Sequence, residues 1–129
     1  MSNVDFSQKQ TTETRSAQAK QATIDAVAAE RYTHEVAGTA MGGVAVFTDR
    51  TTQMKLTAAS VRASQDETYT VDWKTSDGSF VTLTADQILA IANGVGDYVQ
   101  ACYTREATLL AAIDDGTYTE SMLSQGWPG

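Results

Sequence analysis

The stretch that decides the fold is residues 71–114, which reads VDWKTSDGSFVTLT and continues ADQILAIANGVGDYVQACYTREATLLAAID. Its first part alternates apolar and polar residues with a period of two, a pattern typical of a half-buried strand. The dipeptide Asp77-Gly78 favours a chain reversal, because glycine takes a positive φ without steric cost. The sequence therefore predicts a β-hairpin over residues 69–83.

The second part predicts one long helix over residues 85–114. Thr84 and Gln87 have the spacing of a capping box, and Gly116 follows the last helical turn as a stop signal. Apolar residues recur at helical spacing along this helix. They are Ile88, Ala92, Val95, Val99, Cys102, Leu109 and Ile113, with Ile91, Tyr98 and Leu110 beside them and Glu106 as the interruption. This stripe is either the domain core or a seam between copies of the chain.

The predicted helix is long for a small core, since some thirty residues span roughly 45 Å. It must either bend or pack part of its length on another chain. Gly94 and Gly96 mark the expected weak point, because each costs roughly 1 kcal/mol relative to alanine in a helix interior. We predict a bend or a close helix crossing there.

The fold class predicted from these elements is α+β, with a small antiparallel sheet packed against the long C-terminal helix. An apolar strand at about 43–47 is expected to join the hairpin in one sheet, with Trp73 and Phe80 in the core. The glycine-rich residues 36–43 predict a loop before that strand. A helix of about a dozen residues is predicted to follow the strand. Its inward-facing residues are expected to be Met54, Ala58 and Val61, with Leu56 to one side.

The N-terminal part is predicted to be a polar, mobile arm over residues 1–9, followed by a helix to about residue 32. The thin stripe of this helix carries Ile24, Val27 and Arg31. Such a helix either attaches the chain to a partner or folds back on its own domain. We therefore divide the chain into an arm and helix over residues 1–35 and a compact domain over residues 36–129.

The C-terminal segment contains an apolar anchor, Trp127, after a predicted short helix at residues 120–124. A terminal tryptophan either docks in its own domain or anchors a partner. The candidate partner-binding residues of the whole chain are Ile24, Val27, Arg31, Tyr98 and Trp127.

Composition narrows the classes of partner. The chain has 129 residues with 16 acidic and 9 basic side chains, a net charge of −7. Binding to nucleic acid depends on neutralising phosphates with cations, so no nucleic-acid partner is expected. No apolar run is long enough for a membrane span, and the polar N-terminus does not resemble a secretory signal. Cys102 is the only cysteine, which fits a reducing cytoplasm.

No catalytic or metal-binding signature stands out. His34 is the only histidine, and its position between polar residues at a helix end predicts a solvated side chain. One histidine and one cysteine do not make a four-ligand zinc site. The acidic pair Asp114-Asp115 lacks the ligand spacing of a calcium loop. We predict no catalytic residue, no metal and no cofactor.

Several segments resemble, in the same order along the chain, the uncharacterised domain of tail and tail-fibre proteins of tailed bacteriophages and prophages, named only as a domain of unknown function. The likeness covers roughly residues 20–115. Its strongest elements are Phe47-Thr48-Asp49-Arg50, Trp73-Lys74 and Gln100-Ala101-Cys102. The remaining ones are Gly42-Gly43, Gln53 to Leu56, Val71-Asp72, Asp77-Gly78, Leu83-Thr84-Ala85, Tyr98-Val99, Tyr103, Glu106, Ile113 and the Gly-Trp-Pro ending.

The resemblance implies a structural protein of the virion tail or baseplate, made in the bacterial host cytoplasm. Its expected partners are phage tail or tail-fibre proteins and further copies of itself. Contacts are expected through the N-terminal helix and the exposed side of the 84–114 helix. The alternative is a tail-fibre assembly chaperone that binds the fibre protein and is not retained in the virion. Because its N-terminal arm is short, the chain is expected to be a small component rather than a fibre.

Overall fold

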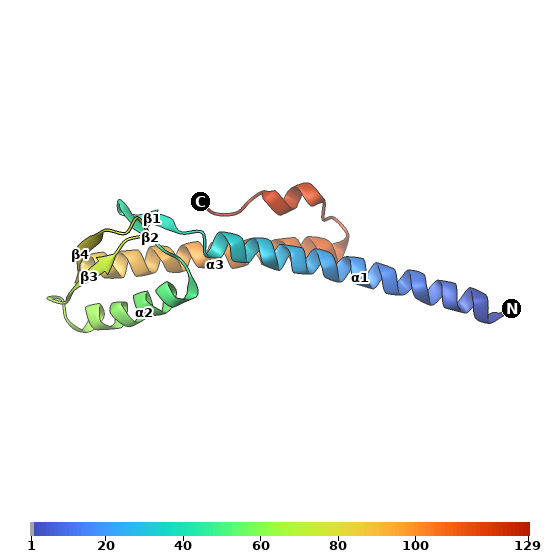
Figure 1. The fold of residues 1–129 in the computed structure, drawn as a ribbon, viewed down its shortest axis with the longest axis horizontal. Coiled ribbons are helices and arrows are strands. Elements are labelled where there is room, and N and C mark those ends of the chain that lie inside the picture. The colour runs from blue at the N-terminus through green and yellow to red at the C-terminus, as the bar shows by residue number, and fades with distance from the viewer. Residues whose placement is uncertain (1) are drawn as a thin grey trace.

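The computed structural model describes residues 2–129, with side chains described from residue 11 onward. Helices and hairpins follow one another along the chain, and the predicted α+β class is confirmed (Figure 1). The elements are α1 (Ser2–Glu35), β1 (Thr39–Met41), β2 (Val44–Val46), α2 (Arg50–Gln65), β3 (Thr70–Lys74), β4 (Phe80–Thr84), α3 (Ala85–Asp115) and the short 3-10 helix η1 (Glu120–Ser124).

Helix α3 begins and ends where the sequence predicts. The hydroxyl of Thr84 accepts a hydrogen bond from the Gln87 backbone N–H at 3.3 Å, and the Gln87 side chain accepts one from the Thr84 N–H at 2.9 Å. This capping box satisfies two of the N–H groups that a helix start leaves unpaired. Gly116 ends the helix in the left-handed conformation, with φ of 81°.

Other elements of the same chain pack along the full length of α3. The hairpins and α2 cover its N-terminal half, and α1 lies along its C-terminal half (Figure 1). The helix is unbroken from Ala85 to Asp115, and its predicted stripe is the core. Its buried residues are Ala85, Ile88, Ile91, Val95, Tyr98, Cys102, Leu109 and Ala112. No second chain is needed to account for a helix of this length.

The close approach predicted at the two glycines occurs at one of them, against a strand rather than a helix. A Cβ atom at Gly94 would lie 2.6 Å from Sδ of Met41 in β1, whereas one at Gly96 would meet nothing within 4 Å. The absent side chain at Gly94 therefore lets the β1–β2 hairpin pack directly on α3.

We predict that Gly96→Ala raises the free energy of unfolding by up to about 1 kcal/mol, because alanine is the better helix former and the site is open. Gly94→Ala should gain less or nothing, since the Met41 side chain must move aside. Urea titrations of both variants check the difference. Equal stabilisation by the two substitutions would mean that Met41 does not pack on Gly94.

The strands form two separate hairpins rather than the single sheet that the sequence predicted. Residues 39–41, predicted to be a loop, pair with β2 in the register Thr39 to Val46. The reversal uses Gly42 and Gly43, both at positive φ, which suits a tight two-residue turn. Strand β2 therefore finds its strand partner nearby in sequence, and its backbone bond to the later hairpin is the one from the Ser76 N–H to the Ala45 carbonyl, at 3.0 Å.

The β3–β4 hairpin is confirmed, but one of its two expected core aromatics faces solvent. Trp73 is half-buried against the core, whereas Phe80 is 66% exposed. The register pairs Trp73 with Val81 and Lys74 with Phe80. Side chains alternate between the two faces of a strand, so Phe80 lies on the face opposite Trp73.

Helix α2 packs with the face opposite to the predicted one. Met54 is 73% exposed and Val61 is 51% exposed, and Ala58 is exposed between them. The buried residues of α2 are Thr52, Leu56, Ala59 and Ala63. Both sets recur at helical spacing, and the observed face carries small alanines, which allow α2 and α3 to approach closely.

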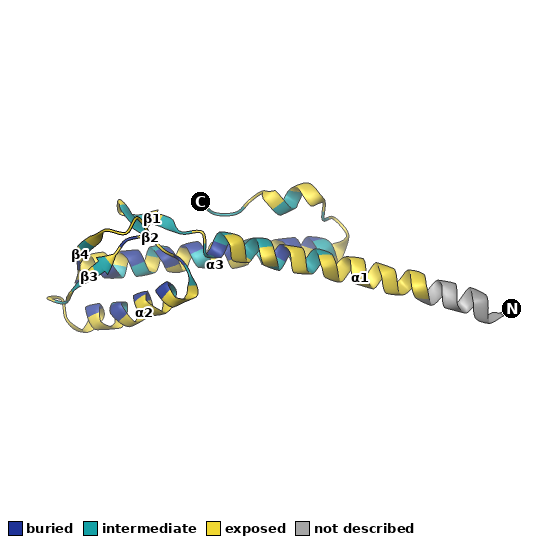
Figure 2. Ribbon diagram, viewed as in Figure 1, coloured by how far each residue is buried: buried dark blue, intermediate teal, exposed yellow. Residues whose placement is uncertain are grey.

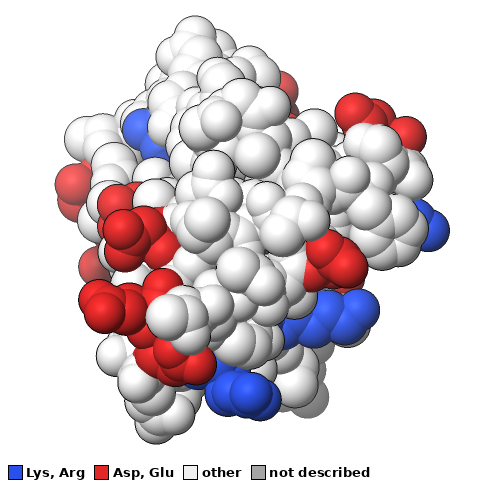
Figure 3. Space-filling model, turned by 90° about the vertical axis from the view of Figure 1, so that its left-hand side faces the viewer, with Lys and Arg blue, Asp and Glu red and all other residues white. Residues whose placement is uncertain are grey.

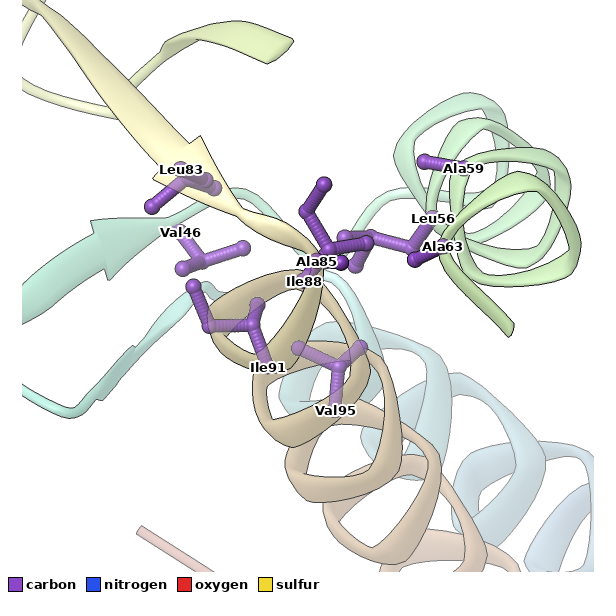
Figure 4. Close-up of a cluster of buried hydrophobic side chains, with 9 residues drawn as sticks. All are labelled: Val46, Leu56, Ala59, Ala63, Leu83, Ala85, Ile88, Ile91 and Val95. Atoms are coloured by element: carbon purple, nitrogen blue, oxygen red, sulfur yellow. The ribbon is translucent and has the colours of Figure 1, made fainter. Parts of the chain in front are cut away.

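The main core joins both hairpins, α2 and the first half of α3 (Figures 2 and 4). Its nine residues are Val46, Leu56, Ala59, Ala63, Leu83, Ala85, Ile88, Ile91 and Val95. Each element contributes only one apolar face, so the core exists only when all of them are assembled.

Helix α1 begins at Ser2, whereas the sequence predicted a polar arm before a helix at about residue 10. Residues 11–22 are exposed, and the second half of α1 packs on α3 (Figure 2). Met1 lies outside the described residues. No described helix combines the length and the apolar character that a bilayer span requires.

Candidate functional site

The five predicted partner-binding residues gather at one seam between α1, α3 and the C-terminal tail. Val27 is fully buried and Tyr98 is 8% exposed, while Ile24, Arg31 and Trp127 are half-buried. Much of their apolar surface is covered by this chain itself. The second half of α1 therefore folds back on its own domain, which was one of the two predicted alternatives. Contact of these five residues with a partner stays a prediction.

A charged network ties the three helices together at this seam. Nη1 of Arg31 lies 2.7 Å from Oε1 of Glu35, and its Nε lies 3.0 Å from Oε1 of Glu106 on α3. Gln53 of α2 donates to Oε2 of Glu35 at 3.0 Å, and Arg50 lies 3.6 Å from the same oxygen. Glu35 is a buried carboxylate in which both oxygens have partners, as burial of a charge requires.

This network determines the charge state of its two central groups. Burial alone would raise the pKa of Glu35, but hydrogen bonds from Gln53 and Arg31 and the charges of Arg50 and Arg31 outweigh it, so the pKa of Glu35 is lowered. For Arg31, burial acts to lower the pKa, whereas its bonds to Glu106 and Glu35 raise it above the ordinary value. The pair therefore stays ionised at neutral pH.

A lowered folded-state pKa makes stability depend on pH. Because Glu35 binds its proton less readily folded than unfolded, its contribution is present above the unfolded pKa of about 4.5 and is lost as pH falls through the folded pKa. We expect Glu35→Gln to be less stable than the unsubstituted protein at pH 7 and the gap to narrow as pH falls below about 4.5. Urea titrations between pH 7 and pH 3 measure the gap, and a constant gap would contradict this assignment.

The C-terminal tail docks on the same seam through stacked rings. The His34 and Trp127 rings lie 5.0 Å apart at an interplanar angle of 7°, and Trp127 Nε1 donates to the Leu123 carbonyl at 2.7 Å. Arg105 of α3 donates to tail carbonyls at 2.8 and 3.1 Å, and the Tyr98 hydroxyl donates to the His34 carbonyl. The predicted solvated His34 is partly exposed, at 31%, because Trp127 of the tail covers one face of its ring.

Exposed apolar side chains are spread over several elements, and two of the large ones lie together on α2. We call Met54, Ala58 and Val61 the outer face of α2. With Phe47 just before the helix, 46% exposed, this face places apolar side chains in solvent on an acidic chain. Contiguous exposed apolar surface is typical of protein-binding sites. The sequence pattern identified these residues but assigned them to the core.

A groove of about 520 Å³ runs between α2 and β3, next to the outer face of α2. Its apolar lining includes Tyr69, Val71 and Trp73 of the hairpin and Ala58 and Ala59 of α2. Its cationic lining residues are Lys55, Arg62 and Lys74. Figure 3 shows the end of the molecule where α2 and the hairpins lie, with charged side chains placed mostly around an uncharged centre. We call this feature the α2–β3 groove.

The described side chains contain no set of three or more His, Cys, Asp and Glu placed to share a metal ion. Cys102 is fully buried, and burial raises the pKa of its thiol. It packs in the α1–α3 seam as a small apolar side chain.

Comparison with known proteins identifies a family but no relative of known role. No curated protein and no solved structure matches the chain. A family model described as "Domain of unknown function (DUF4376)" matches residues 18–123, which span the second half of α1, both hairpins, α2, α3 and most of η1. By this match, the chain belongs to the DUF4376 family of domains of unknown function.

Proposed function

We propose that this protein is a structural component of a phage tail or baseplate that connects tail or tail-fibre proteins. The observation that carries the proposal is the resemblance of ordered segments, above all residues 47–50, 73–74 and 100–102, to the domain of phage tail proteins. The proposal places the protein in the virion after synthesis in the host cytoplasm, in several copies, and assigns it no catalytic role.

The structure supports a role in protein contacts through its exposed apolar side chains. The outer face of α2 leaves Met54 and Val61 largely in solvent, which is costly unless a partner covers them. The residues first predicted to bind a partner are used inside the chain. We therefore assign the contacts to the outer face of α2 and to the exposed residues 11–22 of α1.

The test is mass spectrometry of gradient-purified phage particles, with peptide counts scaled to a known tail protein. We expect the protein at a fixed ratio to that tail protein. The paired variant Met54→Glu/Val61→Glu should fold but be depleted from particles, since it places charge on the outer face of α2. Ala107→Glu, on an exposed position of α3, is the matched control and should be incorporated normally.

Absence of the unsubstituted protein from particles would overturn the structural role. If the protein were then recovered in lysate bound to the fibre protein, the tail-fibre assembly chaperone would become the better assignment. A chaperone could also bind the fibre protein through the exposed outer face of α2. The particle measurement is therefore what separates the two roles.

A further inference from the structure

One edge of strand β3 lacks a strand partner. In the part of the chain that the structure describes, β3 pairs with β4 on one side only. Lining residues of the α2–β3 groove include the consecutive positions Val71, Asp72, Trp73 and Lys74. Successive strand residues point to opposite faces, so a groove that touches all of them runs along the strand edge. The unpaired backbone groups of β3 therefore face this groove.

The groove is lined by three cations and one carboxylate, Asp72, so its charged lining is basic on balance although the chain is acidic. Lys55, Arg62 and Lys74 are three of the nine Lys and Arg residues in a chain of net charge −7. Among the described side chains, none of these three takes part in an ion pair within 4.0 Å, whereas Arg31, Arg50 and Lys20 do. Three cations without an ion-pair partner within 4.0 Å therefore line the same groove.

The apolar part of the groove suits side chains that alternate along an extended backbone. Val71 and Trp73 share one face of β3, and Tyr69 lies just before the strand; each is half-buried, so part of its surface remains in contact with solvent. The Arg62 guanidinium lies 5.0 Å from the centre of the Tyr69 ring, at the boundary between the basic and apolar parts. The groove volume of about 520 Å³ lies within the range of about 300–1,000 Å³ typical of binding sites.

We propose that the α2–β3 groove binds an extended, acidic segment of a partner protein by strand addition to β3. The backbone of the segment pairs with the free edge of β3, its apolar side chains contact Val71 and Trp73, and its carboxylates contact Arg62 and Lys74. Main-chain hydrogen bonds supply affinity in this mode of recognition, and side-chain contacts supply specificity. This inference does not depend on the phage assignment.

Charge selects this occupant over a second copy of the chain. Pairing of two β3 edges would bring two basic grooves together and place cations near cations, which is unfavourable. A nucleic acid would satisfy the cations, but the chain as a whole repels phosphate because of its net charge of −7. An acidic polypeptide segment meets both the cations and the unpaired strand edge.

The test begins with a random nine-residue peptide library selected on the full-length immobilised protein. We expect recovered peptides to alternate apolar residues with Asp or Glu. The best peptide is then made with a fluorescent label, and its Kd is measured by anisotropy. A version of the peptide with N-methyl groups on alternate backbone nitrogens should lose binding, because it cannot pair with a strand edge.

Variants of the protein locate the site. Arg62→Glu/Lys74→Glu should raise the Kd of the peptide about tenfold or more, while the matched Arg15→Glu/Lys20→Glu variant on α1 should leave the Kd within about twofold. Circular dichroism of each variant shows that it is folded.

Four outcomes would overturn the inference. They are the failure to recover any binder, recovery of basic or helical peptides, equal binding by the groove variant, and tighter binding of a twenty-nucleotide oligo-dT than of the peptide. A dimer in sedimentation that dissociates in the groove variant would show instead that a second copy occupies the groove. Failure of the particle experiment would leave this inference standing, so the two proposals are separable.

Discussion

Ile88→Ala should lower the free energy of unfolding by about 2–5 kcal/mol, the usual cost of removing a large buried aliphatic side chain. Ile88 is fully buried on the first turn of α3, where the core residues of the hairpins, α2 and α3 meet (Figure 4). Its loss leaves a cavity among elements that each contribute only one apolar face. Since small domains are stable by about 5–15 kcal/mol, a change of this size is a large fraction of the total.

The measurement is a urea titration followed by circular dichroism, with Val61→Ala as the matched control. Both positions carry β-branched aliphatic residues on helices, but Val61 is 51% exposed on α2. Val61→Ala should change the free energy of unfolding by no more than about 0.5 kcal/mol. A cost at Val61 comparable with that at Ile88 would mean that α2 packs with its other face inward.

Arg31→Met should cost about 3 kcal/mol, because it leaves the buried carboxylate of Glu35 without its closest cation. The same substitution removes the 3.0 Å contact to Glu106, which joins α1 to α3. Arg50 and Gln53 still contact Glu35, so the loss should fall at the lower end of the range for a broken buried pair. Arg31→Lys should lose less, because it keeps the charge but lacks the guanidinium fork that reaches both carboxylates.

Lys20→Met is the control for removing a cation from α1. Lys20 lies 3.5 Å from Asp114, but both side chains are mainly exposed, at 51% and 84%. Exposed ion pairs contribute about 0–1 kcal/mol, so this variant should unfold almost as the unsubstituted protein does. If Arg31→Met and Lys20→Met had equal effects, the Arg31 network would not hold α1 against α3.

Much of the chain could be predicted from sequence where the signal is local. The capping box of Thr84 and Gln87, the stop at Gly116 and the β3–β4 turn at Asp77-Gly78 depend on residues within a few positions of one another. The apolar stripe of α3 was found because many of its positions agree with one helical face, although sequence left open whether it was core or a seam between copies. These features could be predicted because they depend on local backbone geometry and periodicity, not on the rest of the fold.

The tertiary structure decided which surfaces meet. Met54, Ala58 and Val61 have the same helical spacing as Leu56, Ala59 and Ala63, so periodicity could not select the buried face of α2. The pairing of β2 with β1, and not with the later hairpin, follows from competition between two possible partners. Such choices depend on how closely whole elements can approach, which single-sequence patterns do not contain.

The same division holds for the sites. Sequence alone named Ile24, Val27, Arg31, Tyr98 and Trp127 on three separate elements as candidate partner contacts, and in the structure these elements pack on one another. It could not determine that this chain covers much of their surface itself, because residues 36–84 separate α1 from α3. The α2–β3 groove was not found, since its residues share no local motif. Local chemistry thus determined the elements and their ends, while long-range packing determined which apolar and charged faces remain open to a partner.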